Sequence, residues 1–279
     1  MPSAHSLWSG SALDGGLLDR LVRPLGVRVL GLLHYVGSLW SLLVRALSAG
    51  VRSEGRTVVH RAIVGQIYFT GVDAVFIVLM FATGMGGLVI LQALVMFSAT
   101  GNHDVLGGLL RLVLFRELVP VGTALIVIGR PGGPIAVDLA NARVAGEHDL
   151  LSMMGVDLDR YLLWPRIVGV VVSTVALTLV YAVGAVLGGF VVSSLVTETP
   201  FAEYFRLVGV SVLPSDFLLA GIKALVFGTL IGLVSTMQGT RVGRVVTDVP
   251  GAVQRSVVQS LRMVLAADLL LTAAFWWAL

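Results

Sequence analysis

The sequence predicts an all-α integral membrane protein, with an N-terminal interfacial helix region followed by about five transmembrane helices. The composition carries this prediction. Of the 279 residues, 57% are apolar and only 13% are charged, whereas a soluble globular domain carries about 25% charged residues. The 33 glycines also suit helices that approach one another closely within lipid. Because so few charges cannot cover a surface that faces water, we expect a multi-pass membrane protein.

The residues before the first span divide into two parts. Residues 1–16 are rich in Ser and Gly, so we expect them to be disordered. Residues 17–64 repeat leucine and valine at helical spacing between arginines, which predicts one or two amphipathic helices in the membrane interface. Pro24 marks a start or a kink of these helices. The apolar stretch 29–44 leaves a true first span as the alternative.

Residues 65–279 form the predicted membrane domain. Its apolar runs are long enough to cross about 30 Å of hydrocarbon. Residues 105–115 are apolar but contain Arg111, so we expect a helix along the interface there. Four residues interrupt the second span and form a candidate hinge: Pro131, Gly132, Gly133 and Pro134. The five spans are expected at 71–95, 118–139, 166–192, 217–237 and 257–279.

The distribution of arginine predicts the orientation of the spans. Seven arginines precede the first span, four lie at or between the second and third spans, and three lie between the fourth and fifth. The loop after the first span has none, and the 197–215 loop has only Arg206. Because basic residues concentrate on the cytoplasmic side, we expect the N-terminus and the 140–165 turn to be cytoplasmic. The C-terminus is then expected outside.

The chain carries no motif for catalysis or for nucleotide binding. A phosphate-binding P-loop needs Gly-Lys followed by Ser or Thr, but the one lysine, Lys223, is followed by Ala224. HExxH and GxSxG motifs are also missing, and there is no cysteine for thiolate chemistry. We therefore expect no enzyme activity, no catalytic residue, no cofactor and no metal in this chain.

Ionisable residues near or within the spans are the first functional candidates, because a charge in hydrocarbon is costly unless it is paired or faces a cavity. Arg116, Glu117 and Pro120 begin the second span, and Asp268 lies near the middle of the fifth. We predict that they line a cavity or hold a gate. Interfacial anchoring is an equal alternative for the Arg116–Glu117 pair, and a contact that holds helices together is the slightly favoured alternative for Asp268. Lys223 is expected to snorkel from the outer end of the fourth span. The remaining ionisable residues within the spans are Asp73 and Arg262.

Residues 141–154 have the pattern of a short amphipathic helix. Its apolar side is expected to contain Ala140, Val144, Leu150, Leu151 and Met154, and its polar side Arg143, Glu147, His148 and Asp149. Gly155 is placed to cap its C-terminus, and Asp157 to cap the next helix. A helix of this kind docks in a groove of a soluble partner, with an ordinary solvated loop helix as the alternative. We expect His148 at the surface, since it has no second metal ligand at helical spacing.

A series of short motifs runs from about Gly65 to the C-terminus. They are Gly84-Met85 with Gln92, Arg116-Glu117-Leu118 with Pro120, Gly129-Arg130, Asp138, Glu147 with Asp149, Met154-Gly155-Val156-Asp157, Arg160-Tyr161-Leu162, Pro165-Arg166, Ser215-Asp216 with Lys223, Phe227-Gly228, Gln238-Gly239 and Ala267-Asp268. In this order and at these spacings, the region resembles the MlaE/YrbE permeases. These are the membrane subunits of lipid-trafficking ABC transporters associated with MCE proteins.

The resemblance implies a permease subunit at the centre of an ABC complex, built from a homodimer or a pair with a paralogue. An ABC ATPase, which would bind ATP and Mg²⁺, would dock on the 141–155 helix of each copy. The docking residues would be Arg143, Glu147, His148, Asp149 and Met154. An MCE-domain substrate-binding protein would sit on the outer face, and phospholipid or a similar lipid would occupy a cavity between the copies. No nucleic acid is expected as a partner.

Two other functions also fit the sequence. One is a proton- or ion-coupled secondary transporter that uses Asp268, Asp73 and Glu117, although no internal repeat is visible to support it. The other is a scaffold that anchors an extracellular lipid-binding protein without transporting lipid. In each case we expect the cytoplasmic (inner) membrane as the location.

Overall fold

The computed structural model describes residues 18–51, 56–100, 110–197, 200–243 and 245–278. All elements within these ranges are helices, which confirms the predicted all-α class. The segment 1–16, predicted to be disordered, lies outside the described residues. The chain divides into two compact units, one that ends at Val44 and one that begins at Arg45.

Helix α1 (Leu18–Val51) covers most of the predicted interfacial region. It runs as one helix, and no element boundary falls at Pro24, where a start or a kink was expected. Within the described residues, α1 is not among the stretches that are long and apolar enough to cross a membrane. That finding agrees with the predicted interfacial helix, although its placement in the interface stays a prediction.

Five stretches of the described chain are long and apolar enough to cross a membrane, as the sequence predicted. The protein is therefore a multi-pass membrane protein. Each stretch extends beyond the expected span, because the helices continue past their apolar centres. The stretches are Thr57–Met96, Arg111–Val144, Asp159–Thr197, Pro214–Thr240 and Val246–Trp277.

The first stretch is built from two helices joined at Gly71. Helix α2 (Arg56–Thr70) leads through the short 3-10 helix η1 (Val72–Ala74) into α3 (Val75–Thr100). A Cβ atom at Gly71 would lie 2.8 Å from the carbonyl oxygen of Ile67. The turn therefore requires a glycine. Part of the predicted interfacial region, residues 57–64, thus belongs to the first apolar stretch.

The second stretch, Arg111–Val144, belongs to a run of helical elements that is continuous from Leu110 to Val144. Its elements are η2 (Leu110–Leu118), α5 (Val119–Val127), η3 (Ile128–Gly132) and α6 (Gly133–Val144), of which η2 and η3 are π-helical. Residues 110–115 therefore start this stretch, whereas we expected an interfacial helix there. The Pro-Gly-Gly-Pro segment does not break the helix either, because the backbone at Gly132 and Gly133 stays in the right-handed helical region. The wider π turn at η3 accommodates Pro131, which has no N–H to donate.

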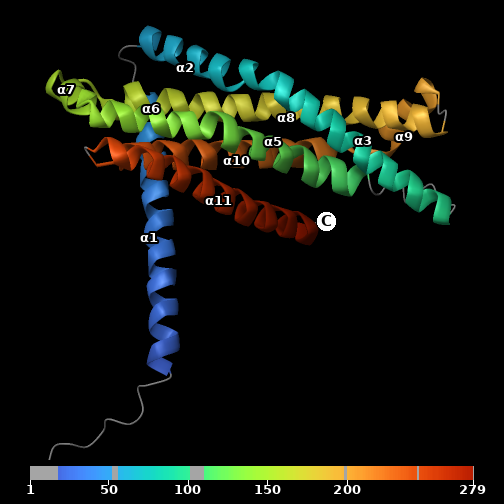
Figure 1. Cartoon of the computed structure of the whole chain (residues 1–279), viewed down its shortest axis with the longest axis horizontal. Helices are drawn as coiled ribbons and strands as arrows, with labels where there is room; N and C mark the ends of the chain where they lie inside the picture. Colours follow the sequence, from blue (N-terminus) through green and yellow to red (C-terminus); the bar gives the residue numbers. More distant parts are fainter. Residues whose placement is uncertain (1–17, 52–55, 101–109, 198–199, 244, 279) are drawn as a thin grey trace, which may run out of the picture. The chain divides into compact units, whose positions relative to one another are not determined.

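The remaining elements complete the bundle. They are α7 (Glu147–Met153), η4 (Asp159–Leu163), α8 (Trp164–Thr197), α9 (Phe201–Ser211), α10 (Pro214–Thr240), η5 (Val246–Asp248) and α11 (Val249–Ala278). In Figure 1 the long helices α3, α5, α8, α10 and α11 run along one direction, with α7 near one end of the bundle and α9 near the other. Helix α8 packs against α2, α3, α5 and α10, and α11 packs against α6 and α10.

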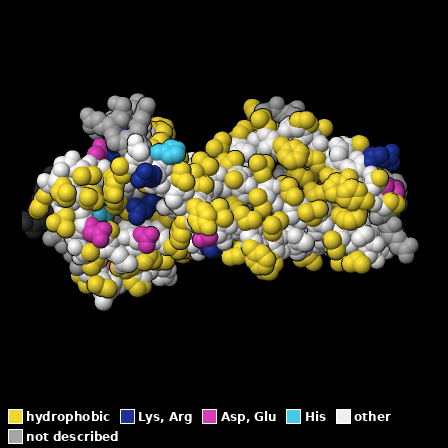
Figure 2. Space-filling model, turned by 90° about the horizontal axis from the view of Figure 1, so that it is seen from above, with side chains coloured by type: hydrophobic (Ala, Val, Ile, Leu, Met, Phe, Trp, Pro, Cys, Tyr) yellow, Lys and Arg dark blue, Asp and Glu magenta, His cyan; other side chains and the backbone are white. Residues whose placement is uncertain are grey.

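Glycines set the close approach of α3 and α8. A Cβ atom at Gly86 would collide with the backbone of Ala185, and a Cβ atom at Gly188 would collide with the carbonyl group of Thr83. Small residues at such crossings let the helix backbones touch within lipid. In the view of Figure 2, hydrophobic side chains cover much of the visible surface, and most charged side chains lie toward the ends of the molecule.

Candidate functional site

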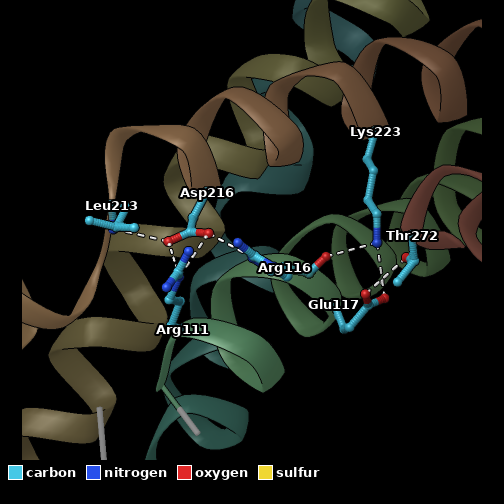
Figure 3. A network of polar contacts seen from close by, with 7 residues as sticks. All are labelled: Arg111, Arg116, Glu117, Leu213, Asp216, Lys223 and Thr272. Carbon is cyan, nitrogen blue, oxygen red and sulfur yellow. Dashed lines mark hydrogen bonds and ion pairs between the residues drawn. The ribbon is translucent and has the colours of Figure 1, made fainter. Parts of the chain in front are cut away.

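Six charged side chains from three helices form an ionic network with Lys223 of α10 at its centre, and Figure 3 draws all of them except Asp268. Its ammonium nitrogen lies 2.7 Å from Asp268 Oδ1 of α11 and 3.0 Å from Glu117 Oε2 of η2. It also donates a hydrogen bond of 2.9 Å to the carbonyl oxygen of Arg116. Thr272 of α11 donates to the other oxygen of Glu117 at 3.0 Å. The lysine ammonium thus makes two hydrogen bonds, to Arg116 and Glu117, and an ion pair with Asp268, whose Oδ1 atom has no hydrogen-bond partner among the described residues.

The second half of the network surrounds Asp216, at the start of α10. Its carboxylate accepts hydrogen bonds from Arg116 Nε at 2.7 Å and from Arg111 Nε at 3.1 Å. It also accepts from the backbone N–H of Leu213 at 2.9 Å, which completes a cap on α10. The Arg116 guanidinium carbon lies 4.9 Å from the ring centre of Phe275, in a cation–π contact. Arg116 therefore joins the two halves of the network.

The network is electrically neutral, and its charged side chains are largely buried except those of Arg111 and Glu117, which are 32% and 37% exposed. The side chains of Asp216 and Lys223 are fully buried, and those of Arg116 and Asp268 are 12% and 13% exposed. Its three cations are Arg111, Arg116 and Lys223, and its three anions are Glu117, Asp216 and Asp268. Charges buried this far are tolerated only when they are paired. The network therefore fastens η2, α10 and α11 together at one end of the bundle.

The structure brings three of the four predicted cavity or gating residues together. Arg116, Glu117 and Asp268 belong to the network, whereas Pro120 is buried near the start of α5 without taking part in it. The expectation that Lys223 snorkels is wrong, because its side chain is fully buried against two carboxylates.

Sequence reasoning missed several members of the network: Arg111, Asp216, Thr272 and Phe275. One signal could have found two of them, Asp216 and Phe275. Asp216 and Lys223 are seven residues apart, as are Asp268 and Phe275, so each pair shares one helix face. Helices α10 and α11 thus each present a face with two network residues.

The predicted coupling segment, residues 141–154, contains the end of α6 and the whole of α7. It lies at the other end of the bundle. It is not one helix, because α6 ends at Val144 and α7 begins only at Glu147. Gly146, with φ of 78°, makes the turn between them. The predicted caps hold: Gly155 has φ of 73° and ends α7, and Asp157 accepts a hydrogen bond of 3.1 Å from the backbone N–H of Asp159. Arg143 donates at 3.0 Å to the carbonyl oxygen of Val242, just after α10.

The side chains of α7 are arranged differently from the amphipathic pattern that we expected. Leu150, Met153 and Met154 are 60%, 83% and 77% exposed, so an apolar patch faces outward. Glu147 is exposed and Asp149 is half-buried. His148, expected at the surface, is instead 5% exposed, and its Nε2 atom has no hydrogen-bond partner among the described residues.

The position of His148 sets its charge. Burial lowers the pKa of His148 below its usual 6.5, and the charges of Arg143 and Arg166 lower this pKa further. Asp149 and Glu147 act in the opposite direction but do not reverse the shift. The folded protein therefore favours the neutral imidazole. No group of three or more His, Asp or Glu residues in the described chain is placed to hold a metal ion.

The candidate hinge lies between these two regions, in η3 and the start of α6. Pro131, Gly132 and Gly133 are buried and Pro134 is half-buried. Gly132 lies against α10, since its Cβ atom would be 3.3 Å from Ser235 Oγ. The geometry is a helix with one wide turn, and bending at this turn stays a prediction.

Known proteins are similar to this chain over the region that holds the ionic network and α7. The family described as Permease MlaE matches residues 63–274. A probable ABC transporter permease protein of Rickettsia conorii is 28% identical over 260 residues, which cover 93% of this chain and 99% of the relative. The intermembrane phospholipid transport system permease protein MlaE of Haemophilus influenzae is 28% identical over 217 residues, 77% of this chain and 83% of the relative. Protein TRIGALACTOSYLDIACYLGLYCEROL 1 of Arabidopsis thaliana is 29% identical over 216 residues, 76% of this chain and 60% of the relative.

The matched region begins within α2 and ends within α11, so it contains most of each of the five apolar stretches, the six charged residues of the ionic network and α7. It covers well over half of the chain. The family resemblance expected from the short motifs is confirmed, and the chain belongs to the MlaE permease family of ABC transporters.

Proposed function

We propose that this chain is the permease subunit of an ABC transporter that moves phospholipid or a related lipid between the inner membrane and an MCE-domain carrier. ATP and Mg²⁺ would bind a separate ATPase subunit. The family and the phospholipid transport system of the Haemophilus influenzae relative support the lipid role. The structural observation that carries the proposal is the exposed apolar patch of α7, formed by Leu150, Met153 and Met154.

This patch has the features of a docking site for a soluble partner. It lies outside the five apolar stretches that are long enough to cross a membrane. Exposed methionine and leucine beside charged residues suit a groove in a partner protein. Glu147 supplies an exposed carboxylate at the start of the same helix. We assign the patch to the ATPase, with Arg143 and His148 as residues that position α7 from behind.

The arrangement suggests how ATPase movement would reach the lipid path. Helix α7 follows α6 after one turn, and Arg143 ties α6 to the end of α10 through Val242. Helices α6 and α10 continue toward the ionic network at the other end of the bundle. ATPase closure would push α7, rock the spans and change the shape of a cavity shared with a second permease copy. The MCE-domain protein would receive the lipid at the network end, which positive-inside orientation places outside.

The test is the substitution Glu147→Lys in the full chain, co-expressed with an ABC ATPase subunit that co-purifies with the wild-type chain. We expect the variant to insert in the membrane, to lose the ATPase on purification and to lose ATP-dependent lipid transfer between vesicles. Glu203→Lys is the matched control, because Glu203 is also an exposed carboxylate in the first turn of a short helix. Normal transfer by Glu147→Lys would contradict the docking role.

The same assay separates the proposed function from a proton-coupled transporter. Lipid transfer that continues without ATP but stops with a protonophore would favour the secondary transporter. All three carboxylates of the network already have basic partners, so they do not support a free proton site. ATP-dependent transfer that survives the protonophore would support the ABC permease.

A further inference from the structure

Two adjacent methionines at the end of α7 are the most exposed methionines of the described chain. Met153 and Met154 are 83% and 77% exposed, against 64% for Met80, which is the next. The other described methionines, Met80 among them, all lie within the five apolar stretches. Among the described residues, therefore, only this pair of thioethers is exposed outside the stretches that could cross a membrane.

The backbone at the end of α7 fixes the side on which the pair lies. The N–H of Met154 donates a hydrogen bond of 3.0 Å to the carbonyl oxygen of Leu150. Gly155, with φ of 73°, then ends the helix. Met153 and Met154 follow Leu150 by three and four residues, so the three side chains share one side of α7. A chemical change at the two thioethers therefore changes most of the exposed apolar patch.

Thioethers of this kind react with peroxides. The chain has no cysteine, so methionine holds all of its sulfur. In the reaction, the sulfur atom gives an electron pair to one oxygen of hydrogen peroxide. An S–O bond forms, the O–O bond breaks, and the other oxygen leaves as water after a proton transfer. The thioether is oxidised to a sulfoxide, the peroxide is reduced, and methionine sulfoxide reductases can restore the thioether.

The sulfoxide reverses the property that makes the patch a docking surface. A thioether is stabilised in an apolar groove because it leaves water there. A sulfoxide oxygen accepts hydrogen bonds from water and loses them in such a groove. Oxidation of Met153 and Met154 leaves Leu150 as the one unchanged member of the patch. The oxidised patch is therefore a much poorer surface for an apolar groove.

We propose that Met153 and Met154 form an oxidation site that regulates docking of the ATPase. Peroxide converts the two thioethers to sulfoxides, and the oxidised patch no longer holds the ATPase. The inference rests on the proposed function in assigning this patch to the ATPase, and it adds the regulation of that same surface. A docked ATPase covers the thioethers, so the free permease is the form that is oxidised. Oxidation then prevents docking until the sulfoxides are reduced.

The first measurement locates the oxidation. The purified full chain in nanodiscs is treated with hydrogen peroxide, the peroxide is removed, and each methionine is followed by peptide mass spectrometry. We expect sulfoxide to form at Met153 and Met154 before it forms at Met237, whose side chain is 2% exposed. Formation at Met237 first, or at the same rate, would overturn the oxidation site.

The second measurement is the affinity for an ABC ATPase subunit that co-purifies with the untreated chain. The peroxide is removed before the ATPase is added, so the ATPase itself is never oxidised. We expect the treatment to weaken binding about tenfold or more, since polar groups of the oxidised patch lose hydrogen bonds on docking. Treatment with both methionine sulfoxide reductases, each of which reduces one sulfoxide epimer, should restore the affinity.

Substitutions identify the responsible residues. Combining Met153→Leu with Met154→Leu replaces both thioethers by apolar groups that peroxide does not oxidise. The readout is the ratio of the affinities after and before peroxide within one protein, so a change in basal affinity does not enter. We expect no effect of peroxide on the double variant. Met80→Leu, which removes an exposed thioether from α3, is the matched control and should keep the full effect.

Each outcome decides the inference. An oxidised wild-type chain that binds the ATPase as tightly as the untreated chain would refute it, as would an equal effect of peroxide on the double variant. If the double variant binds too weakly to measure, the reductases decide in the wild-type chain: affinity must return as the sulfoxides at Met153 and Met154 disappear. If no ABC ATPase co-purifies with the untreated chain, the proposed function itself fails. The mass spectrometry needs no ATPase, so the two failures are distinguishable.

Discussion

Removing the charge of Lys223 should destabilise the bundle more than any other single change in the ionic network. Lys223→Met keeps an unbranched apolar stem but removes the ammonium group that contacts Arg116, Glu117 and Asp268 at 2.9, 3.0 and 2.7 Å. The side chain is fully buried, so water cannot replace the ammonium group. Two carboxylates then remain close together without their shared cation.

The size of the effect follows from the burial of the pair. Removing one partner of a buried ion pair costs about 3 to 5 kcal/mol, because the other partner is left charged and unpaired. For a chain of this size, about 1 kcal/mol corresponds to roughly 2 to 4 °C in thermal midpoint, so we expect Lys223→Met to melt roughly 6 to 20 °C lower. The thermal midpoint of the detergent-purified protein, followed by intrinsic fluorescence, measures this shift.

A second substitution tests whether charge balance is the cause. Lys223→Met leaves the network with one excess negative charge, and adding Asp268→Asn restores neutrality with nearly the same shape. The double variant should therefore melt above Lys223→Met, with a coupling energy between the two positions of about 0.5 to 3 kcal/mol. Arg206→Met removes a positive charge from the exposed face of α9 and should change the stability by about 0.5 kcal/mol or less. An unchanged midpoint for Lys223→Met, or a double variant less stable than the single one, would refute the reasoning.

Two further predictions concern α7 and the α3–α8 contact. Because folding lowers the pKa of His148, the local stability of α7 should be complete above about pH 6.5, fall as the pH drops from there toward the lowered pKa, and stay level below it. Hydrogen-exchange protection of α7 between pH 5 and 8 measures this, and a profile that stays the same in His148→Gln would argue against it. Gly188→Ala should destabilise the protein by about 1 to 3 kcal/mol, because its Cβ atom meets the Thr83 carbonyl group. Gly221→Ala, where a Cβ atom meets nothing within 4 Å, should be neutral or stabilising in the same thermal assay, and equal shifts for the two variants would contradict the contact.

The sequence predicted the number and approximate place of the spans, because hydropathy and length alone decide which helices cross a membrane. It placed their ends less well. Helix α11 begins at Val249, eight residues before the expected start of the fifth span at 257. The residues between include Gln254 and Arg255, which are polar but continue the helix. Hydropathy reports where the chain is apolar and does not report where the helix ends.

The ionic network shows what the sequence did not determine. The cost of burying Glu117 and Asp268 was readable from their places in apolar runs. Their partner was not, because pairing depends on how α10 is rotated against α11 and η2. Lys223 was expected to snorkel because its position along α10 was known from the sequence. The side of α10 on which it lies was not known.

The α7 segment failed for a different reason. Its apolar residues were assigned to one helix of uniform period, but Gly146 introduces a left-handed turn that resets the helical phase. After that turn, His148 points inward, and Met153 and Met154 point outward. The expected pattern therefore fails after this glycine at His148, Leu150 and Met154, whereas Arg143 and Glu147 are exposed as expected.

The positions of the two regions suggest why the π turn lies between them. The second stretch is fastened near one end by the Glu117–Lys223 pair and near the other by the hydrogen bond from Arg143 to Val242, and both fasteners lead to α10 or the residue just after it. A helix held at two points would respond to a push on α7 by bending where its backbone is least supported, and we expect this place to be η3. Pro131 has no N–H, and Gly132 and Gly133 have no side chains to resist a change of packing against α10. Bending at η3 would then alter the angle at which Arg116 and Glu117 meet α10 and α11 without separating their ion pairs, so the network would act as a pivot for the movement.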